Sequence, residues 1–115
     1  MRHQKKGKIL DRKKAARQSL LKNLAINLII HKKIKTTLAK AKAVQPLVEK
    51  SITLAKKNNL TVRRKLLSYL PEKVVNKLFT EFGPYYQERK GGYTRIIKIG
   101  QRLGDRAEIV QIELI

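Results

Sequence analysis

The chain has 115 residues, of which 28 are Lys or Arg and 8 are Asp or Glu, so its formal net charge is +20. It contains no Cys and no apolar run of the ~20 residues that a transmembrane helix requires, which excludes disulfides, thiolate metal sites and a membrane span. Because like charges repel within a compact fold, the excess predicts a polyanionic partner such as nucleic acid. Hydrophobic residues make up 42% of the chain and recur periodically, which favours a folded cytosolic domain over a disordered tail.

Residues 1–10 have no hydrophobic periodicity and are rich in Lys and Arg, so we expect an extended basic arm. Residues 11–115 are expected to form a single domain, because no linker long enough to divide them is visible. The density of charge in the arm exceeds that of an ordinary solvated surface. We therefore interpret the arm as the strongest functional signal, one for contact with RNA or DNA.

The first helix is predicted to begin after Asp11, a candidate N-cap, and to run to about Ile30. Leu20, Leu24 and Leu28 recur every four residues and give this helix an apolar stripe. Its first two turns are almost entirely basic, although positive charge at a helix N-terminus opposes the helix dipole. We interpret this local conflict as a concession to function.

A short strand is expected over residues 31–36, and Thr37 is predicted to cap a second helix over residues 38–57. Pro46 lies inside that helix, where a kink or a lost hydrogen bond is expected. The dipeptide Asn58–Asn59 is predicted to end it.

Two short helices are predicted next, one over residues 61–70 and one that begins at Pro71 and that Gly83–Pro84 ends. The hydrophobic period then changes from helical to alternating. Strands are expected over residues 93–99 and 107–115, joined as a hairpin through Gly104–Asp105. Helices followed by paired strands indicate an α+β fold.

Catalysis and cofactor binding have little support in this sequence. The two histidines, His3 and His31, are far apart and lack neighbouring carboxylates, so neither a catalytic set nor a metal site is suggested. Gly91–Gly92 is not followed by the lysine of a nucleotide-binding loop. We expect no enzyme activity, no cofactor and no metal.

A second candidate contact is the segment from Glu88 to Arg95, in which Gly91 and Gly92 allow a phosphate to come close and the cations neutralise it. Tyr93 either stacks on a base or packs on the sheet, and the sequence leaves both alternatives open. A third cluster, Arg63–Arg64–Lys65, reads more simply as a solvated helix face.

Several blocks of the sequence resemble the bacterial-type family of large-subunit ribosomal protein seventeen, in family order and at family spacing. The blocks are Met1–Arg2–His3 with Gly7, Ile34–Lys35–Thr36–Thr37–Leu38, Lys40–Ala41–Lys42, Ile52–Thr53–Leu54–Ala55–Lys56, Lys77–Leu78–Phe79, Gly83–Pro84, Gly91–Gly92–Tyr93–Thr94–Arg95–Ile96 with Lys98, Gly104–Asp105 and Ile112–Glu113–Leu114. They cover the chain from its first residue almost to its last. Before Arg17 the chain has Lys13–Lys14–Ala15–Ala16 where the family often has a stretch rich in Ser and His.

The resemblance implies a structural constituent of the bacterial large ribosomal subunit that binds large-subunit rRNA near the exit of the peptide tunnel. It implies several helices packed on a small mixed β-sheet, with neighbouring large-subunit proteins as further partners and a cytoplasmic location. It implies no membrane and no small-molecule substrate. Charge and resemblance together predict rRNA contacts from the arm, the first helix and three later clusters, namely Arg2, His3, Lys5, Lys6, Lys8, Arg12, Lys13, Lys14, Arg17, Lys35, Arg63, Arg64, Arg89, Lys90, Gly91, Gly92, Tyr93, Arg95 and Lys98.

One alternative of another class is a free nucleoid-type or RNA-chaperone protein that binds DNA or RNA diffusely. Association with large subunits through moderate salt would separate the two interpretations, since a diffuse binder washes off or follows DNA. A cationic membrane-surface protein is a more distant alternative, disfavoured because so small a domain needs the apolar stripe of its first helix for its core.

Overall fold

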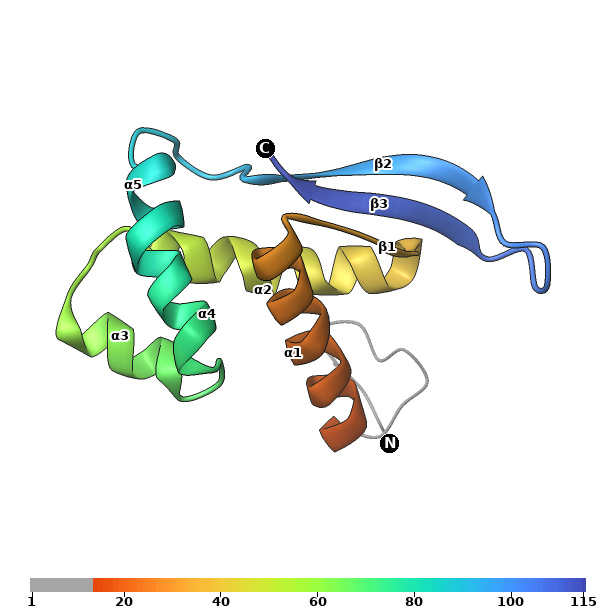
Figure 1. The fold of residues 1–115 in the computed structure, drawn as a ribbon. Helices are drawn as coiled ribbons and strands as arrows, with labels where there is room; N and C mark the ends of the chain where they lie inside the picture. The colour runs from red at the N-terminus through yellow and green to blue at the C-terminus, as the bar shows by residue number, and fades with distance from the viewer. Residues whose placement is uncertain (1–13) are drawn as a thin grey trace, which may run out of the picture.

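The computed structural model describes residues 14–115. In chain order its elements are α1 (Lys14–His31), β1 (Lys33–Thr37), α2 (Leu38–Ala55), α3 (Leu60–Leu67), α4 (Glu72–Lys77), a π-helical turn η1 (Leu78–Phe82), α5 (Gly83–Tyr85), β2 (Thr94–Gln101) and β3 (Glu108–Leu114). Helices packed against one small sheet confirm the α+β prediction (Figure 1). The predicted arm and the predicted cap Asp11 lie outside the described residues.

The sheet has three strands in the order β1-β3-β2, and β3 pairs with both neighbours antiparallel. It is therefore antiparallel throughout rather than mixed. The predicted hairpin is confirmed as β2 and β3 with Gly104–Asp105 in the connection, and a register shift between Lys98 and Gly100 marks a bulge in β2.

Helix α2 begins as predicted, because Thr37 is extended at the N-cap and its Oγ1 accepts a hydrogen bond from the Lys40 amide at 3.4 Å. The helix continues through Pro46, whose side of α2 is exposed. A proline offers no amide hydrogen to the preceding turn, so one helical bond is lost there without ending the helix. Past the end of α2, Asn58 has a left-handed backbone with φ +48°, and Asn59 caps α3.

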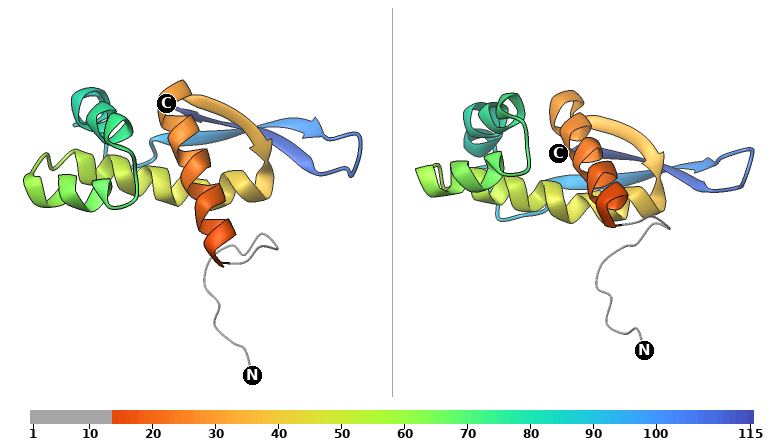
Figure 2. Two further views of the ribbon diagram at one scale, coloured as in Figure 1. Left: turned by 60° about the horizontal axis from the view of Figure 1, so that its bottom comes forward. Right: turned by 90° about the horizontal axis from the view of Figure 1, so that it is seen from below.

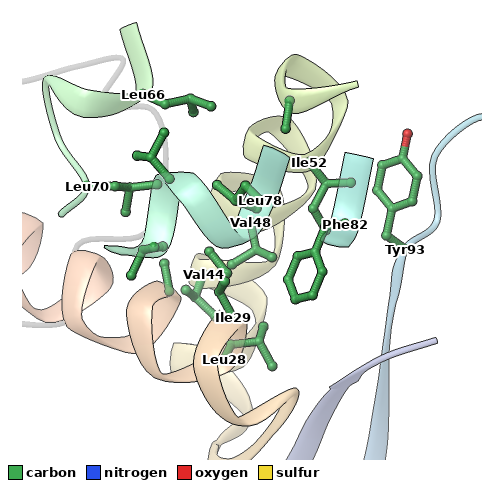
Figure 3. Close-up of a cluster of buried hydrophobic side chains, with 14 of the residues drawn as sticks. Leu28, Ile29, Val44, Val48, Ile52, Leu66, Leu70, Leu78, Phe82 and Tyr93 are labelled. Atoms are coloured by element: carbon green, nitrogen blue, oxygen red, sulfur yellow. The ribbon is translucent and has the colours of Figure 1, made fainter. Parts of the chain in front are cut away.

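The hydrophobic core lies between α1, α2, the α4–α5 segment and the inner face of the sheet (Figure 3). Its centre includes Leu28, Val44, Val48, Ile52 and Leu78, all of them fully buried. From α1 only Ala25, Leu28 and Ile29 are buried, so the first turns of this helix project beyond the core (Figures 1 and 2). The predicted stripe on α1 is right in its phase and reaches the core only in its second half.

The prediction that Gly83–Pro84 ends a helix is wrong. Gly83 has a helical backbone with φ −54°, and the chain runs from η1 into α5 as far as Tyr85. A Cβ on Gly83 would lie 3.2 Å from the carbonyl oxygen of Ala55, so glycine allows the helix to approach the end of α2. Pro84 is tolerated because it lies in the first turn of α5.

The hairpin β2–β3 extends away from the helices and makes the molecule elongated (Figures 1 and 2). The principal extents are 44 × 37 × 24 Å and the radius of gyration is 15.0 Å. A compact domain of this length has a radius of gyration of about 13 Å. The far end of the hairpin thus projects beyond the helices of residues 14–115 (Figure 1).

Candidate nucleic-acid interface

The positive charges fall into two classes, those paired with an acid and those that are not. In the described part of the chain there are four ion pairs, Lys77–Glu81, Arg95–Glu113, Lys98–Glu108 and Arg102–Asp105. Three of them belong to the β2–β3 hairpin. Among residues 14–115, no cation of α1, β1, α2 or α3 belongs to an ion pair, so these elements contribute unpaired positive charge to the field of the described residues.

The start of α1 presents two of the predicted contacts. Lys14 is exposed and Arg17 is half-buried, both on the turns that project beyond the core. The first turn contains no acid to offset them. The other predicted residues of this region, Arg2, His3, Lys5, Lys6, Lys8, Arg12 and Lys13, lie outside the described residues.

The strand register brings further cations onto one side of the sheet. Glu113 of β3 faces Lys33 on one neighbour and Arg95 on the other, and Gln111 likewise faces Lys35 and Ile97. Directly opposed residues share a face, so these six residues form what we call the outer sheet face, opposite the buried Val110 and Ile112. The face joins two predicted contacts, Lys35 and Arg95, that lie far apart in sequence.

Lys33 was not predicted as a contact, yet it is exposed on the outer sheet face beside Lys35. The alternation of Lys33, Ile34 and Lys35 was the available signal, because it places both lysines on the side away from the core. The neighbouring Lys32 is also exposed and has a left-handed backbone with φ +67° at the end of α1. Cations that form no ion pair within residues 14–115 thus follow one another from α1 into β1.

The turn before β2 has the backbone that its glycines predicted. Gly91 has φ +98° and Gly92 has φ +64°, a region in which side chains with a Cβ are strained. Within residues 14–115, no atom beyond the glycine and its two chain neighbours lies within 4 Å of a Cβ added at either position, so the space over the turn is open. Arg89 donates from Nε to the Gly92 carbonyl at 3.1 Å and closes the turn, while Lys90 is exposed.

The hypothesis that Tyr93 stacks on a base is wrong, because the side chain is buried. The alternative was packing on the sheet, and the contacts of the side chain are instead with Tyr86, Thr53 and Lys56 of the helical segments. Tyr93 belongs to the buried cluster and is 1% exposed (Figure 3). Its ring meets that of Tyr86 with centroids 5.0 Å apart. The hydroxyl accepts hydrogen bonds from Lys56 at 3.1 Å and Thr53 at 3.3 Å, and donates to the Arg89 carbonyl at 3.3 Å. Through its bond to the Arg89 carbonyl, the buried Tyr93 side chain therefore holds the glycine turn against the helices.

The same contacts change the acidity of the Tyr93 hydroxyl. Burial raises its pKa, but the hydrogen bonds from Thr53 and Lys56 and the charge of Lys56 favour the phenolate more strongly. The pKa of Tyr93 consequently lies below its ordinary value. Lys56, whose ammonium lies 5.3 Å from the ring centroid, is thus a structural cation of the turn.

The α3 cluster lies apart from the other predicted contacts. Arg63 donates to the side chain of Asn76 and lies 5.6 Å from the centroid of the Phe79 ring, so its guanidinium ties α3 to the α4–η1 segment. Arg64 and Lys65 are exposed. Figure 1 places α3 at one end of the molecule and the hairpin that carries Lys98 at the other. Lys98 itself is exposed and lies 3.6 Å from Glu108.

We predict that Gly92→Val lowers the free energy of unfolding by about 1–2 kcal/mol, because a β-branched residue is strained at φ +64°. Gly92→Asn should stay within about 0.5 kcal/mol, since asparagine tolerates this conformation. Urea denaturation of both variants measures the difference. Equal stability of the Val and Asn variants would show that the left-handed conformation is not required.

The Gly92→Asn variant also tests whether RNA occupies the open space over the turn. If RNA backbone enters that space, the folded Gly92→Asn protein should bind rRNA more weakly than Lys65→Ala, which removes one exposed charge of α3. Unchanged binding of Gly92→Asn would mean that the turn is only a connector.

Other kinds of site find no support in residues 14–115. No three His, Asp or Glu side chains there are grouped as a metal ion would require. None of the helices in the same residues is long and apolar enough to cross a membrane.

Comparison with known proteins gives a consistent result. The family model described as "Ribosomal protein L17" matches residues 20–115. Two curated relatives named "Large ribosomal subunit protein bL17", from Desulfitobacterium hafniense strains DSM 10664 / DCB-2 and Y51, are each 53% identical to this chain over 107 residues. The alignments cover 92% of this chain and 96% of each relative.

Proposed function

The chain belongs to the ribosomal protein L17 family, and from that membership we propose that it binds large-subunit rRNA through cations that have no acidic partner. As a member it is a structural component of the large ribosomal subunit, in the cytoplasm, and not an enzyme. A free nucleoid-type protein or RNA chaperone, the alternative that charge alone left open, has no comparable support. Binding to rRNA and the position of the chain within the subunit go beyond family membership and are proposals.

The observation that carries the proposal is the uneven pairing of charge. Cations of α1 and β1, among them Lys14, Lys33 and Lys35, have no ion-pair partner among the described residues, whereas Arg95, Lys98 and Arg102 of the hairpin are paired. A cation held by a carboxylate has less to gain from a phosphate, because the carboxylate must first be displaced. The first group is thus the better matched to a phosphate backbone, whose neutralisation releases counterions.

Residues 1–10 are proposed to act as a separate rRNA-binding arm in front of a single domain that begins at residue 11. The arm is rich in Lys and Arg and precedes the first turns of α1 in the sequence. Those turns project beyond the core and carry cations of their own. A position near the exit of the peptide tunnel is proposed on the family resemblance alone.

Two double variants test the proposal, each removing two positive charges. Lys33→Ala/Lys35→Ala should make the plot of log K against log salt less steep by roughly 1.5, because about 0.7–0.9 of a counterion is released per phosphate neutralised. Lys98→Ala/Arg102→Ala should change the slope much less, because both cations already have acidic partners. Filter binding to large-subunit rRNA fragments over a range of salt concentrations gives both slopes.

The unmodified chain should show a slope of roughly −6 if about eight cations of the arm and α1 each meet a phosphate. A slope near zero would mean that these charges are merely solvated. Equal effects of the two double variants would mean that net charge, rather than the pairing of charge, sets the contacts.

A further inference from the structure

The projecting hairpin exposes large apolar side chains at its far end. Ile99 is 52% exposed, and Leu103 at the tip is 101% exposed, as much as in an extended chain. Ile97, 43% exposed, lies further back on the outer sheet face, opposite Gln111. The bulge between Lys98 and Gly100 falls among them and turns the strand locally. Large apolar side chains that are exposed close together are typical of interaction sites.

The same hairpin carries almost no surplus charge, although the chain as a whole carries +20. Over residues 94–114 the four cations are Arg95, Lys98, Arg102 and Arg106, and the three acids are Asp105, Glu108 and Glu113, so the surplus is one positive charge. Lys98 and Arg102 pair with acids of the hairpin itself. The hairpin therefore has few free positive charges with which to neutralise phosphates. In this it differs from the surfaces proposed to bind rRNA.

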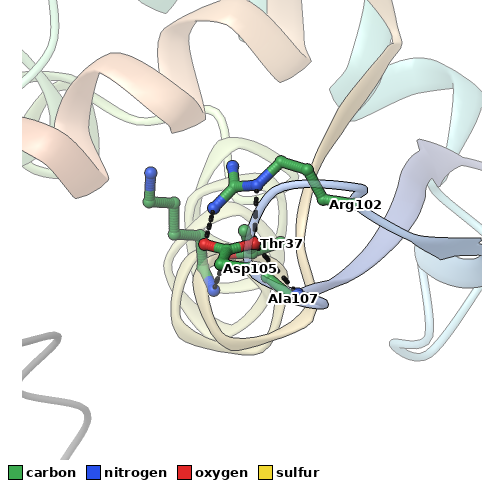
Figure 4. Close-up of polar contacts among 5 residues, drawn as sticks. Thr37, Arg102, Asp105 and Ala107 are labelled. Carbon is green, nitrogen blue, oxygen red and sulfur yellow. Dashed lines mark hydrogen bonds and ion pairs between the residues drawn. The ribbon is translucent and has the colours of Figure 1, made fainter.

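The tip is held in one shape by its own polar contacts (Figure 4). The Arg102 guanidinium donates two hydrogen bonds to the Asp105 carboxylate, from Nε at 3.0 Å and from a terminal nitrogen at 2.6 Å. The same carboxylate accepts a hydrogen bond from the Ala107 amide at 3.1 Å. The Arg102 amide donates to the Ala107 carbonyl at 2.8 Å, and the Arg106 amide donates to the Arg102 carbonyl at 2.9 Å. These contacts present Leu103 without a further loss of loop entropy on binding.

We propose that the end of the β2–β3 hairpin docks into an apolar, nearly uncharged pocket on a neighbouring protein of the large subunit, with Leu103 as the anchoring side chain. An exposed aliphatic anchor surrounded by internally paired charges matches the core and rim of a protein interface. A second copy of this chain is disfavoured, because two chains of charge +20 repel each other. The inference rests on membership in the large subunit and does not depend on the proposed rRNA contacts.

Site-specific cross-linking in purified large subunits tests the proposal. The chain has no Cys, so Leu103→Cys provides a unique thiol for a benzophenone maleimide, and Lys33→Cys provides a matched position on the outer sheet face. After subunits are assembled with the labelled chain and irradiated, Leu103→Cys should yield an adduct with another ribosomal protein, identified by mass spectrometry. Lys33→Cys should yield adducts with rRNA.

The outcomes separate the two proposals. An adduct of Leu103→Cys with rRNA or with a second copy of the chain, or no adduct above that of the unmodified protein, overturns the docking proposal. If Lys33→Cys reacts with protein alone while Leu103→Cys still reacts with its neighbour, the docking proposal stands and the rRNA contact of the outer sheet face fails.

A charge placed at the tip gives an independent measurement. Leu103→Asp should fold normally because the side chain makes no buried contact, and its retention in salt-washed subunits should fall by about tenfold relative to Leu103→Met, as expected for loss of an interface anchor. Equal retention of the two variants would overturn the role assigned to Leu103.

Discussion

Tyr93→Ala is expected to lower the free energy of unfolding by about 3–5 kcal/mol, the usual effect of removing a large buried aromatic ring. The ring is almost fully buried and meets Tyr86 in an edge-on contact, so alanine would leave a cavity between α2, α5 and the sheet. The hydroxyl bonds to Arg89, Lys56 and Thr53 would be lost as well. Urea denaturation followed by circular dichroism measures the change.

Tyr93→Phe is the matched control, since it keeps the ring and removes only the hydroxyl. It should lower the free energy of unfolding by only about 1 kcal/mol. The Arg89 carbonyl loses the tyrosine hydroxyl as a donor but still accepts a hydrogen bond from Lys56. The folded Phe variant should bind rRNA as the unmodified chain does. A Tyr93→Ala protein within about 1 kcal/mol of the unmodified chain would contradict the buried position of the ring.

Removing residues 2–10 is expected to weaken binding to large-subunit rRNA on the order of a hundredfold at about 0.15 M salt, because each phosphate neutralised by Arg2, Lys5, Lys6 or Lys8 releases most of a counterion. The shortened protein should retain its helical content and cooperative unfolding, since the buried cluster extends from Ala25 to Ile112. Filter binding and thermal denaturation measure the two properties separately.

A full-length protein in which those four cations are replaced by glutamine is the control for the length of the arm. It should lose nearly as much affinity as the shortened protein, because the charge rather than the chain is proposed to bind. Full affinity in both proteins would assign the rRNA contacts to the domain, and non-cooperative unfolding of the shortened one would make the arm part of the fold.

Much of the fold could be predicted because its signals are local. The stripe of leucines on α1, the Thr37 cap and the alternation along β3 each depend on residues close together in sequence. The end of the helix at Gly83–Pro84 could not be predicted in this way. Gly83 serves a tertiary contact with Ala55, and that contact overrides the usual meaning of glycine as a helix end.

In the candidate site, too, the features set by local sequence could be predicted and those set by distant residues could not. The left-handed backbone at Gly91 and Gly92 followed from residue type alone. The orientation of Tyr93 depended on Tyr86 and Lys56, which come from other segments, and the sequence therefore left it open. Lys33 joined Arg95 only through a strand register that spans most of the chain.

The middle position of β3 in the sheet has a consequence for how the protein is made. Strands β1 and β2 each pair with β3 and not with each other, although β3 is the last of the three along the chain. No strand pair of this sheet can therefore form until residues 108–114 have been synthesised, while α1 and α2 can form earlier from local contacts. Closing β1 onto β3 brings together segments about 75 residues apart, the kind of distant pairing that slows folding. During synthesis β1 therefore has no strand partner in this sheet until residues 108–114 follow it.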